Sequence, residues 1–471
     1  MTEVAAATLS TPPPPRTRNL ALLAFIVLSL SVSMATTQEE TPEIGSPLYW
    51  ALVIGAALLP LLDVGAIYRT LFGRGLLLLG FALTAGSWHL LTGDLRVVLQ
   101  LGLMVWVAAW LSSDNARLCV RDLLGVYLAS VVVGVALWLL TDLNQWGLVP
   151  GTTAEHYGVW RVSYFSNIAM SAMLSLAVTM VLTRTMASAR AHSLVLGLAL
   201  YFLVFSFVRT ALIALLLYVA LRWWFARQDH PSPRSLFWTA LLVGIGINLM
   251  IATTNVVLEH LQEFPVISRL FLRGETGLTP EEIREQAYRP WLWMQHLILF
   301  ETSPFLMGLG VFEFSEVQPE ALLVGTTPAG NEALLTRLLA TYGLPALLFV
   351  LYLISRLRES ARQCDLWACA CFPPIILLVM QWGNFFHPTD AIGAIFFLMI
   401  VHGSKAFADD PSALPASEGP ETDLDEAAAH PQPLGNEVDG AAQAKESEAG
   451  AQARTLAPGR NAAIHPVPGQ S

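Results

Sequence analysis

Twelve apolar runs of about 16 to 22 residues constrain this chain more than any other feature. At about 1.5 Å per residue, each run is long enough as a helix to cross the roughly 30 Å hydrocarbon layer of a bilayer. They lie at residues 19–36, 47–67, 72–91, 95–112, 122–141, 162–183, 192–207, 208–226, 235–254, 338–355, 366–383 and 389–407. The runs predict an all-α polytopic membrane protein with about twelve transmembrane helices.

Composition excludes a soluble enzyme. Apolar residues make up 54% of the chain and charged residues 13%, whereas an ordinary soluble domain is about one quarter charged. A soluble chain of this length could not bury so much apolar surface. The four cysteines predict no disulfide framework, and Cys369 and Cys371 have no histidine beside them, so we interpret them as packing residues rather than metal ligands.

The least certain boundary lies at Phe207, where two runs abut and one long buried helix is the alternative. Charge sidedness favours two helices. With the split, the short segments predicted to face the cytoplasm hold fifteen Lys and Arg, and the other face holds eight. This distribution follows the positive-inside rule and predicts that both termini are cytoplasmic.

The net charge of −10 belongs mainly to one end of the chain. Residues 409–471 hold 11 acids and three bases, a balance of −8, so residues 1–408 hold 25 acids and 23 bases. We therefore predict a membrane domain at 19–407 between a disordered arm at 1–18 and a disordered acidic cytoplasmic tail at 408–471. Nothing in this charge pattern favours a nucleic-acid partner.

Two predicted outer connections are long, at 142–161 and 255–337, and long loops beside compact helices usually bind or catalyse. In the larger loop, Thr279 and Glu282 form a capping-box pattern around Pro280, and an apolar stripe follows. These features predict an amphipathic helix over 280–301, kinked at Pro290. The proline and glycines of 303–312 predict a tight re-entry after it.

Arginines on the predicted outer face indicate an anionic ligand. Arg209 stands among apolar residues at a helix end, where a dry, unpaired guanidinium would cost several kcal/mol, and Arg161 precedes another span. The guanidinium fork binds phosphate bidentately and stays charged. The alternatives are that these side chains snorkel or pair with loop acids, and that codon usage explains the excess of 24 Arg over two Lys.

Three segments, in order, resemble the bacterial O-antigen ligase and polymerase superfamily of membrane glycosyltransferases. The first two are the segment 161–167, which enters a span, and the helix start at 206–214. The third is a long loop with its exit, represented by 289–293, 303–312, 331–335 and 342–345. The similarity covers roughly residues 160–400.

The resemblance implies a GT-C-like helical bundle that takes a glycan from undecaprenyl diphosphate at the periplasmic face without a metal or other cofactor. By the same comparison, Arg161, Arg209 and Arg289 would bind the diphosphate while a base activates an acceptor hydroxyl. Arg337, at the exit of the loop, is the fourth candidate substrate-binding residue.

One position departs from the ligases. Gly330 stands where their acid–base histidine usually precedes an asparagine, which favours a polysaccharide polymerase over a ligase. Glu332 and His387 are the candidate catalytic bases that we prefer. His156, His260 and His296 are weaker candidates on the same face.

Several other functions remain open. The same chemistry could serve a growing glycan, lipid A core or a pilin-like protein as acceptor. A flippase or secondary transporter is the alternative of another class, but the halves show no internal repeat and ionisable residues are nearly absent at mid-span, Asp63 excepted. A structural scaffold is the third alternative.

Overall fold

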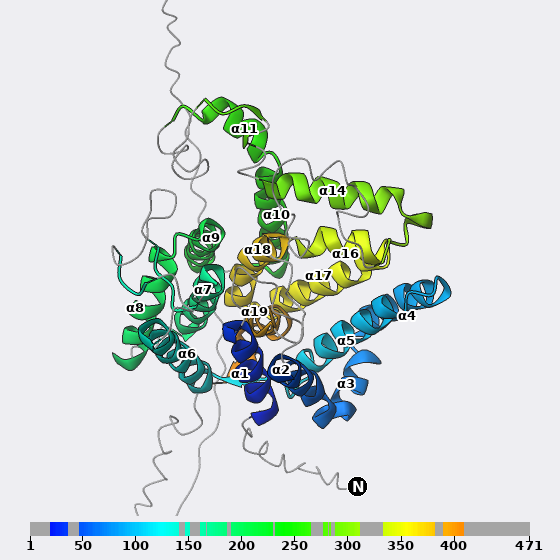
Figure 1. Ribbon diagram of the computed structural model, residues 1–471, viewed down its shortest axis with the longest axis horizontal. Helices are drawn as coiled ribbons and strands as arrows, with labels where there is room; N and C mark the ends of the chain where they lie inside the picture. The colour runs from blue at the N-terminus through cyan, green and yellow to red at the C-terminus, as the bar shows by residue number, and fades with distance from the viewer. Residues whose placement is uncertain are drawn as a thin grey trace, which may run out of the picture. The chain divides into compact units, whose positions relative to one another are not determined.

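The computed structural model describes residues 19–35, 47–140, 147–150, 161–165, 167–185, 190–228, 231–264, 277–280, 282–283, 288–310, 333–381 and 390–408. Over these ranges the chain is mostly helical (Figure 1). The predicted arm lies outside the described residues, and so does the predicted tail apart from Ala408. The predictions for these two segments therefore remain predictions.

The helices follow the predicted order. In the first half they are α1 (Leu20–Ala35), α2 (Pro47–Leu58), a 3-10 turn (Leu59–Asp63), α3 (Val64–Leu71), α4 (Leu76–Leu91), α5 (Leu95–Leu111), α6 (Val120–Leu140), α7 (Ile168–Thr185) and α8 (Arg190–Phe205). In the second half they are α9 (Arg209–Ala226), α10 (Pro233–Ala252), α11 (Thr254–Leu261), α14 (Tyr288–Thr302), α16 (Leu334–Tyr342), α17 (Ala346–Arg362), α18 (Leu366–Gln381) and α19 (Ala391–His402). Short 3-10 turns lie at Pro304–Leu306 and Gly403–Ala406, and β1 (Leu118–Cys119) pairs in parallel with β2 (Phe407–Ala408).

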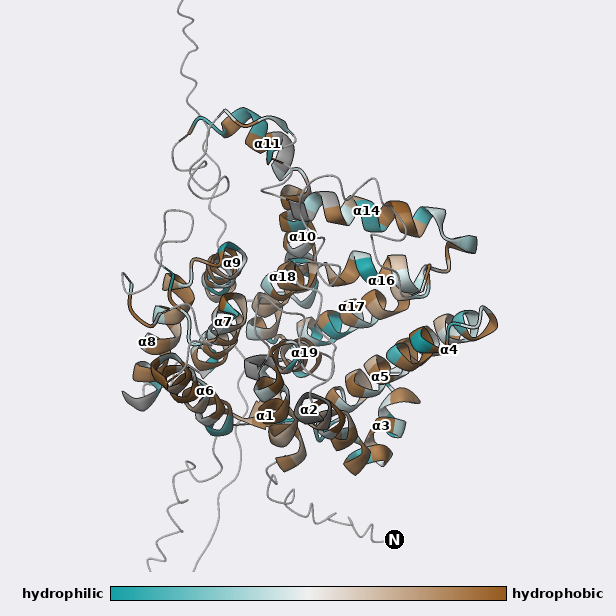
Figure 2. Ribbon diagram, in the orientation of Figure 1, coloured by the Kyte–Doolittle hydropathy of each residue, from teal (hydrophilic) through white to brown (hydrophobic). Residues whose placement is uncertain are grey.

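Among the described residues, four helical segments are long and apolar enough to cross a membrane: Ala51–Leu71, Val120–Leu140, Arg209–Ala226 and Pro233–Ala252. Several shorter helices are also apolar, and Figure 2 shows hydrophobic residues covering much of the bundle. These features are those of an all-α membrane protein. The number of twelve spans stays a prediction.

The predicted break at Phe207 is confirmed. Helix α8 ends at Phe205 and α9 begins at Arg209, so two helices meet here rather than one long helix. Phe207 has a φ of 51°, a left-handed conformation that a continuous helix does not contain.

Three predicted spans differ clearly from those expected. The run at 47–67 is interrupted by the 3-10 turn at Leu59–Asp63 and continues as helix to Leu71. The run at 162–183 becomes helical only at Ile168, because the Asn167 side chain accepts hydrogen bonds from the amides of Ala169 (3.1 Å) and Met170 (3.3 Å) and caps the helix there. The run at 338–355 is divided between α16 and α17. Gly343, with a φ of 66°, ends α16.

The predicted capping box is present. The Thr279 amide donates to Glu282 Oε2 at 2.7 Å, and the Glu282 amide donates to Thr279 Oγ1 at 3.3 Å. Pro290 lies in the first turn of α14, where a helix loses no backbone hydrogen bond to proline. The predicted helix over 280–301 passes through residues 281 and 284–287, which lie outside the described residues, so its continuity and its kink stay predictions.

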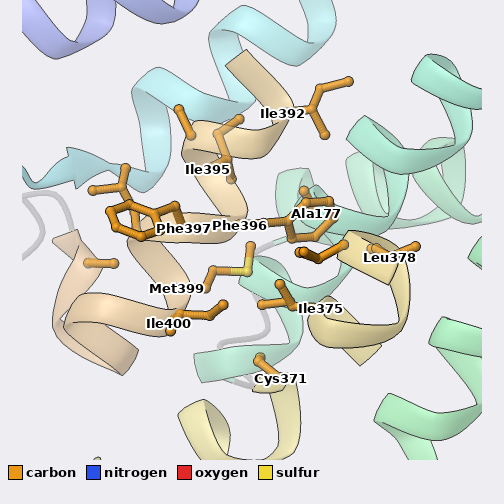
Figure 3. Close-up of a cluster of buried hydrophobic side chains, with 14 of the residues drawn as sticks. Ala177, Cys371, Ile375, Leu378, Ile392, Ile395, Phe396, Phe397, Met399 and Ile400 are labelled. Atoms are coloured by element: carbon orange, nitrogen blue, oxygen red, sulfur yellow. The ribbon is translucent and has the colours of Figure 1, made fainter. Parts of the chain in front are cut away.

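The centre of the core is formed by α18 and α19. Figure 3 shows Phe396 and Met399 of α19 beside Ile375 and Leu378 of α18, with Ala177 of α7 against them. Each of these side chains is 1% exposed or less. Helix α18 also contacts α9, α10, α16 and α17, so it ties the parts of the bundle together.

Candidate functional site

Arg161 and Arg209 lie at one end of the bundle, on neighbouring backbone segments. Residues 161–165 are not helical, and the amide of Val162 donates to the carbonyl of Phe205 at 3.0 Å, while the amide of Ser163 donates to Gly147 at 3.2 Å. Arg161 therefore lies beside Phe205, the last residue of α8. Arg209 follows Phe205 by four residues. Both arginines are half-buried.

The segment after Arg161 is held rigidly. Ser163 and Tyr164 are at most 1% exposed, and Ser163 Oγ contacts Ser171 Oγ at 2.9 Å. Gly134 of α6 lies so close to the Tyr164 carbonyl that a Cβ atom would collide with it. These contacts fix the backbone from which the Arg161 side chain projects.

Arg209 is the first residue of α9, at the positive end of the helix dipole. Its N-cap, Val208, makes no side-chain capping hydrogen bond. The first amides of a helix have no intrahelical acceptor, and together with the dipole they favour an anion. A guanidinium at this position adds a full positive charge to the same place.

The other two predicted substrate-binding arginines belong to α14 and α16, which pack on each other (Figure 1). Arg289 is the second residue of α14, and its side chain lies outside the described part of the structure. Arg337 is the fourth residue of α16 and is half-buried. The structure thus places Arg161 and Arg209 on adjoining backbone segments, and Arg337 on another helix, α16.

His296 joins α14 to α16. Its Nδ1 lies 3.0 Å from Thr336 Oγ1, and its side chain is fully buried. Burial lowers the pKa of His296 to about 3, and the positive charge of Arg337 adds to the lowering. A general base works best with a pKa near ambient pH, so His296 serves here as a neutral packing and hydrogen-bonding group.

The expected tight re-entry is present after α14. Gly308 and Gly310 have φ values of 86° and 81°, which favour glycine. The amides of Leu309 and Gly310 donate to the carbonyls of Ala340 (2.8 Å) and Thr341 (3.0 Å) at the end of α16. This turn holds α14 against α16.

Helix α18 contacts both α9, which begins with Arg209, and α16, which carries Arg337. Trp293 Nε1 of α14 donates to the Met380 carbonyl at 2.9 Å, which places α14 over the end of α18. The next residue, Gln381, is 5% exposed, and its Nε2 has no hydrogen-bond partner. A buried amide donor without an acceptor is costly unless a ligand completes it.

The two predicted catalytic bases, Glu332 and His387, lie outside the described residues, as does His156. His260 is exposed on α11. Asp63 ends the 3-10 turn before α3. Its carboxylate accepts a hydrogen bond from Asn115 Nδ2 at 2.9 Å, so it binds the turn after α5.

The sequence reasoning missed Gln381 and Thr336. A glutamine at the end of an apolar helix is the only signal that could have indicated Gln381. Thr336 gave none, because its role depends on the docking of α14. In the described part of the chain, no three His, Cys, Asp or Glu side chains lie together as a metal site would require.

Comparison of the sequence with protein-family models and with curated proteins finds no match. The functional argument therefore rests on the residues themselves. They provide two half-buried arginines near the start of α9, where no side chain caps the helix. The adjoining helix α18 adds the buried side-chain amide of Gln381, whose Nε2 has no hydrogen-bond acceptor.

Proposed function

We propose that this protein is a membrane glycosyltransferase that extends a polysaccharide by taking glycan from undecaprenyl diphosphate at the periplasmic face of the bacterial inner membrane. One observation carries the proposal. The residue after Arg161 is hydrogen-bonded to Phe205, the last residue of α8, and Arg209 begins the next helix, α9. Two arginines on adjoining backbone segments, one of them at a helix start that carries the positive end of the dipole, suit a diphosphate.

The chemistry is displacement at the anomeric carbon of the donor glycan. The acceptor hydroxyl oxygen forms a bond to that carbon, the bond from the carbon to the diphosphate oxygen breaks, and its electron pair leaves with the diphosphate. The hydroxyl proton passes to a base. Arg161 and Arg209 would stabilise the negative charge that grows on the leaving diphosphate, as preorganised donors do in other transfer reactions.

Glu332 and His387 are the bases that we propose, because both come from connections on the same predicted face as the arginines. His296 is a poor candidate, since its ring is fully buried and its pKa is lowered to about 3, first by that burial. Helix α14, which Trp293 ties to α18, would cover the site and help to position the acceptor.

The acceptor separates this proposal from its near relatives. A polymerase uses a growing glycan, whereas a ligase uses lipid A core and an O-oligosaccharyltransferase uses a pilin-like protein. The absence of histidine at Gly330 favours the polymerase.

The test is reconstitution of the purified protein in liposomes with an undecaprenyl-diphosphate-linked oligosaccharide. We expect longer glycans together with released undecaprenyl diphosphate. Arg209→Ala should abolish lengthening, while Arg358→Ala, which removes an exposed arginine from α17, should not change it. Movement of the lipid across the bilayer without lengthening would contradict the proposal and support a flippase.

A further inference from the structure

A second polar site lies at the opposite, predicted cytoplasmic, end of the helices, between α3 and the turn after α5. It is a pocket of about 150 Å³, roughly ten times the ~15 Å³ that one water needs. Its lining consists of Ala66, Arg69, Thr70, Arg74, Ser113, Asp114 and Asn115. Helices α3 and α5 contact each other directly (Figure 1).

The charge of the lining is +1. Arg69 and Arg74 contribute two positive charges and Asp114 one negative charge. Burial alone would raise the pKa of Asp114, but the hydrogen bond and charge of Arg74 outweigh it and lower that pKa, so the carboxylate stays ionised. A ligand with one negative charge would therefore neutralise the net charge of the pocket.

Hydrogen-bond donors in the pocket remain available. Ser113 is 1% exposed, and its Oγ has no hydrogen-bond partner. Arg69 donates from Nε to the carbonyl of Gly65 at 3.2 Å, and its side chain is otherwise exposed on α3. A phosphate oxygen satisfies both kinds of donor, because it accepts from hydroxyl and guanidinium groups alike.

The wall around these donors is fixed. Asn115 donates from Nδ2 to Asp63 at 2.9 Å, and the carbonyl of Asn115 accepts from Asn19 Nδ2 at 2.7 Å. Two separate segments, at Asp63 and at Asn19, thus hold the turn after α5. A site with this framework does not need to be ordered by its ligand.

Apolar and aromatic side chains are exposed on the same short stretch as Arg69. Leu62 is 74% exposed, Tyr68 61% and Phe72 56%, and the Tyr68 and Phe72 rings are 4.4 Å apart. Aromatic residues are enriched where lipid headgroups meet hydrocarbon. A ligand with a phosphate and an apolar tail matches both parts of this surface, whereas free phosphate matches only one.

We infer that this pocket binds the phosphodiester headgroup of an anionic phospholipid, with the acyl chains along the exposed apolar residues of the 3-10 turn and α3. The site lies at the other end of the bundle from Arg161 and Arg209 and does not depend on the proposed transferase activity.

The experiment is native mass spectrometry of the purified full-length protein mixed with equal amounts of phosphatidylglycerol and phosphatidylcholine. We expect phosphatidylglycerol to be retained about tenfold more, because both lipids offer phosphodiester oxygens but the choline of phosphatidylcholine brings a positive charge to a lining that is already positive. Arg69→Gln should reduce that preference, and Ser113→Ala should reduce the retention of phosphatidylglycerol itself. Arg358→Gln, which removes an exposed arginine elsewhere, should keep it.

Equal retention of the two lipids would overturn the inference, and so would wild-type retention of phosphatidylglycerol in both pocket variants. Displacement of the lipid by millimolar inorganic phosphate would assign the site to free phosphate instead. The thermal midpoint of each variant is measured in parallel. Ser113→Ala retains the charge and the ion pair between Arg74 and Asp114, so it keeps the test decisive if Arg69→Gln is unstable.

Discussion

The amide of Val162 donates a 3.0 Å hydrogen bond to the carbonyl of Phe205. Through this bond the segment before α7 is joined to the end of α8, although 43 positions of sequence separate the two residues. Arg161 precedes Val162 directly, and Arg209 follows Phe205 by four residues. The backbone itself therefore brings together the two arginines on which the functional proposal depends.

Asn167 should matter for stability because its side chain caps α7. We expect Asn167→Ala to destabilise the protein by about 0.5–2 kcal/mol, since the amides of Ala169 and Met170 lose their acceptor. Thermal unfolding in detergent measures the effect. Asn167→Asp keeps an acceptor oxygen and should remain close to wild type, and an alanine variant as stable as the aspartate variant would contradict the capping role.

Gly308 should not tolerate a side chain. Its φ of 86° is unfavourable for alanine, and a Cβ atom would meet the Thr341 carbonyl. We expect Gly308→Ala to cost about 1–3 kcal/mol in unfolding free energy. Gly197→Ala in α8 is the matched control, because nothing lies within 4 Å of the added Cβ, and it should leave stability equal or slightly higher. Equal midpoints for the two variants would argue against the tight turn.

His296 should make stability depend on pH. In the unfolded chain a histidine takes up a proton near pH 6.5, whereas burial lowers the pKa of His296 in the folded protein to about 3. The unfolded state therefore binds more protons between these values, and stability falls as pH decreases below 6.5, by about 1.4 kcal/mol per pH unit.

The measurement is the thermal midpoint of wild type and His296→Gln between pH 7 and pH 4. The variant should lose less stability over this range than the wild type. His260→Gln, which replaces an exposed histidine of α11, should keep the wild-type slope. Parallel curves for wild type and His296→Gln would show that His296 is not held neutral.

Local signals in the sequence predicted several features correctly. The charge distribution around Phe207 indicated two helices where hydropathy alone allowed one, and the structure has the break there. Thr279 and Glu282 predicted their reciprocal capping bonds, because a capping box depends only on residues three positions apart.

Features that depend on distant contacts could not be read in the same way. The apolar run from Val162 looks helical in the sequence. In the structure, however, the Val162 amide bonds to Phe205, which is distant in sequence, and the Ser163 amide bonds to Gly147 in the preceding loop. The division of the tenth span at Gly343 depends on close packing against Leu306 and Met307. The burial of His296 arises only when α14 docks on α16.

The central claim is that Arg161 and Arg209 bind the diphosphate of the donor lipid. The most direct measurement is the dissociation constant of the purified protein for undecaprenyl diphosphate, compared among wild type, Arg161→Gln, Arg209→Gln and the control Arg358→Gln. We predict that each of the first two variants binds about 10- to 100-fold more weakly, as loss of a charge-assisted contact implies, and that the control binds as wild type does. Wild-type affinity in both Arg161→Gln and Arg209→Gln, with helix content unchanged, would contradict the account.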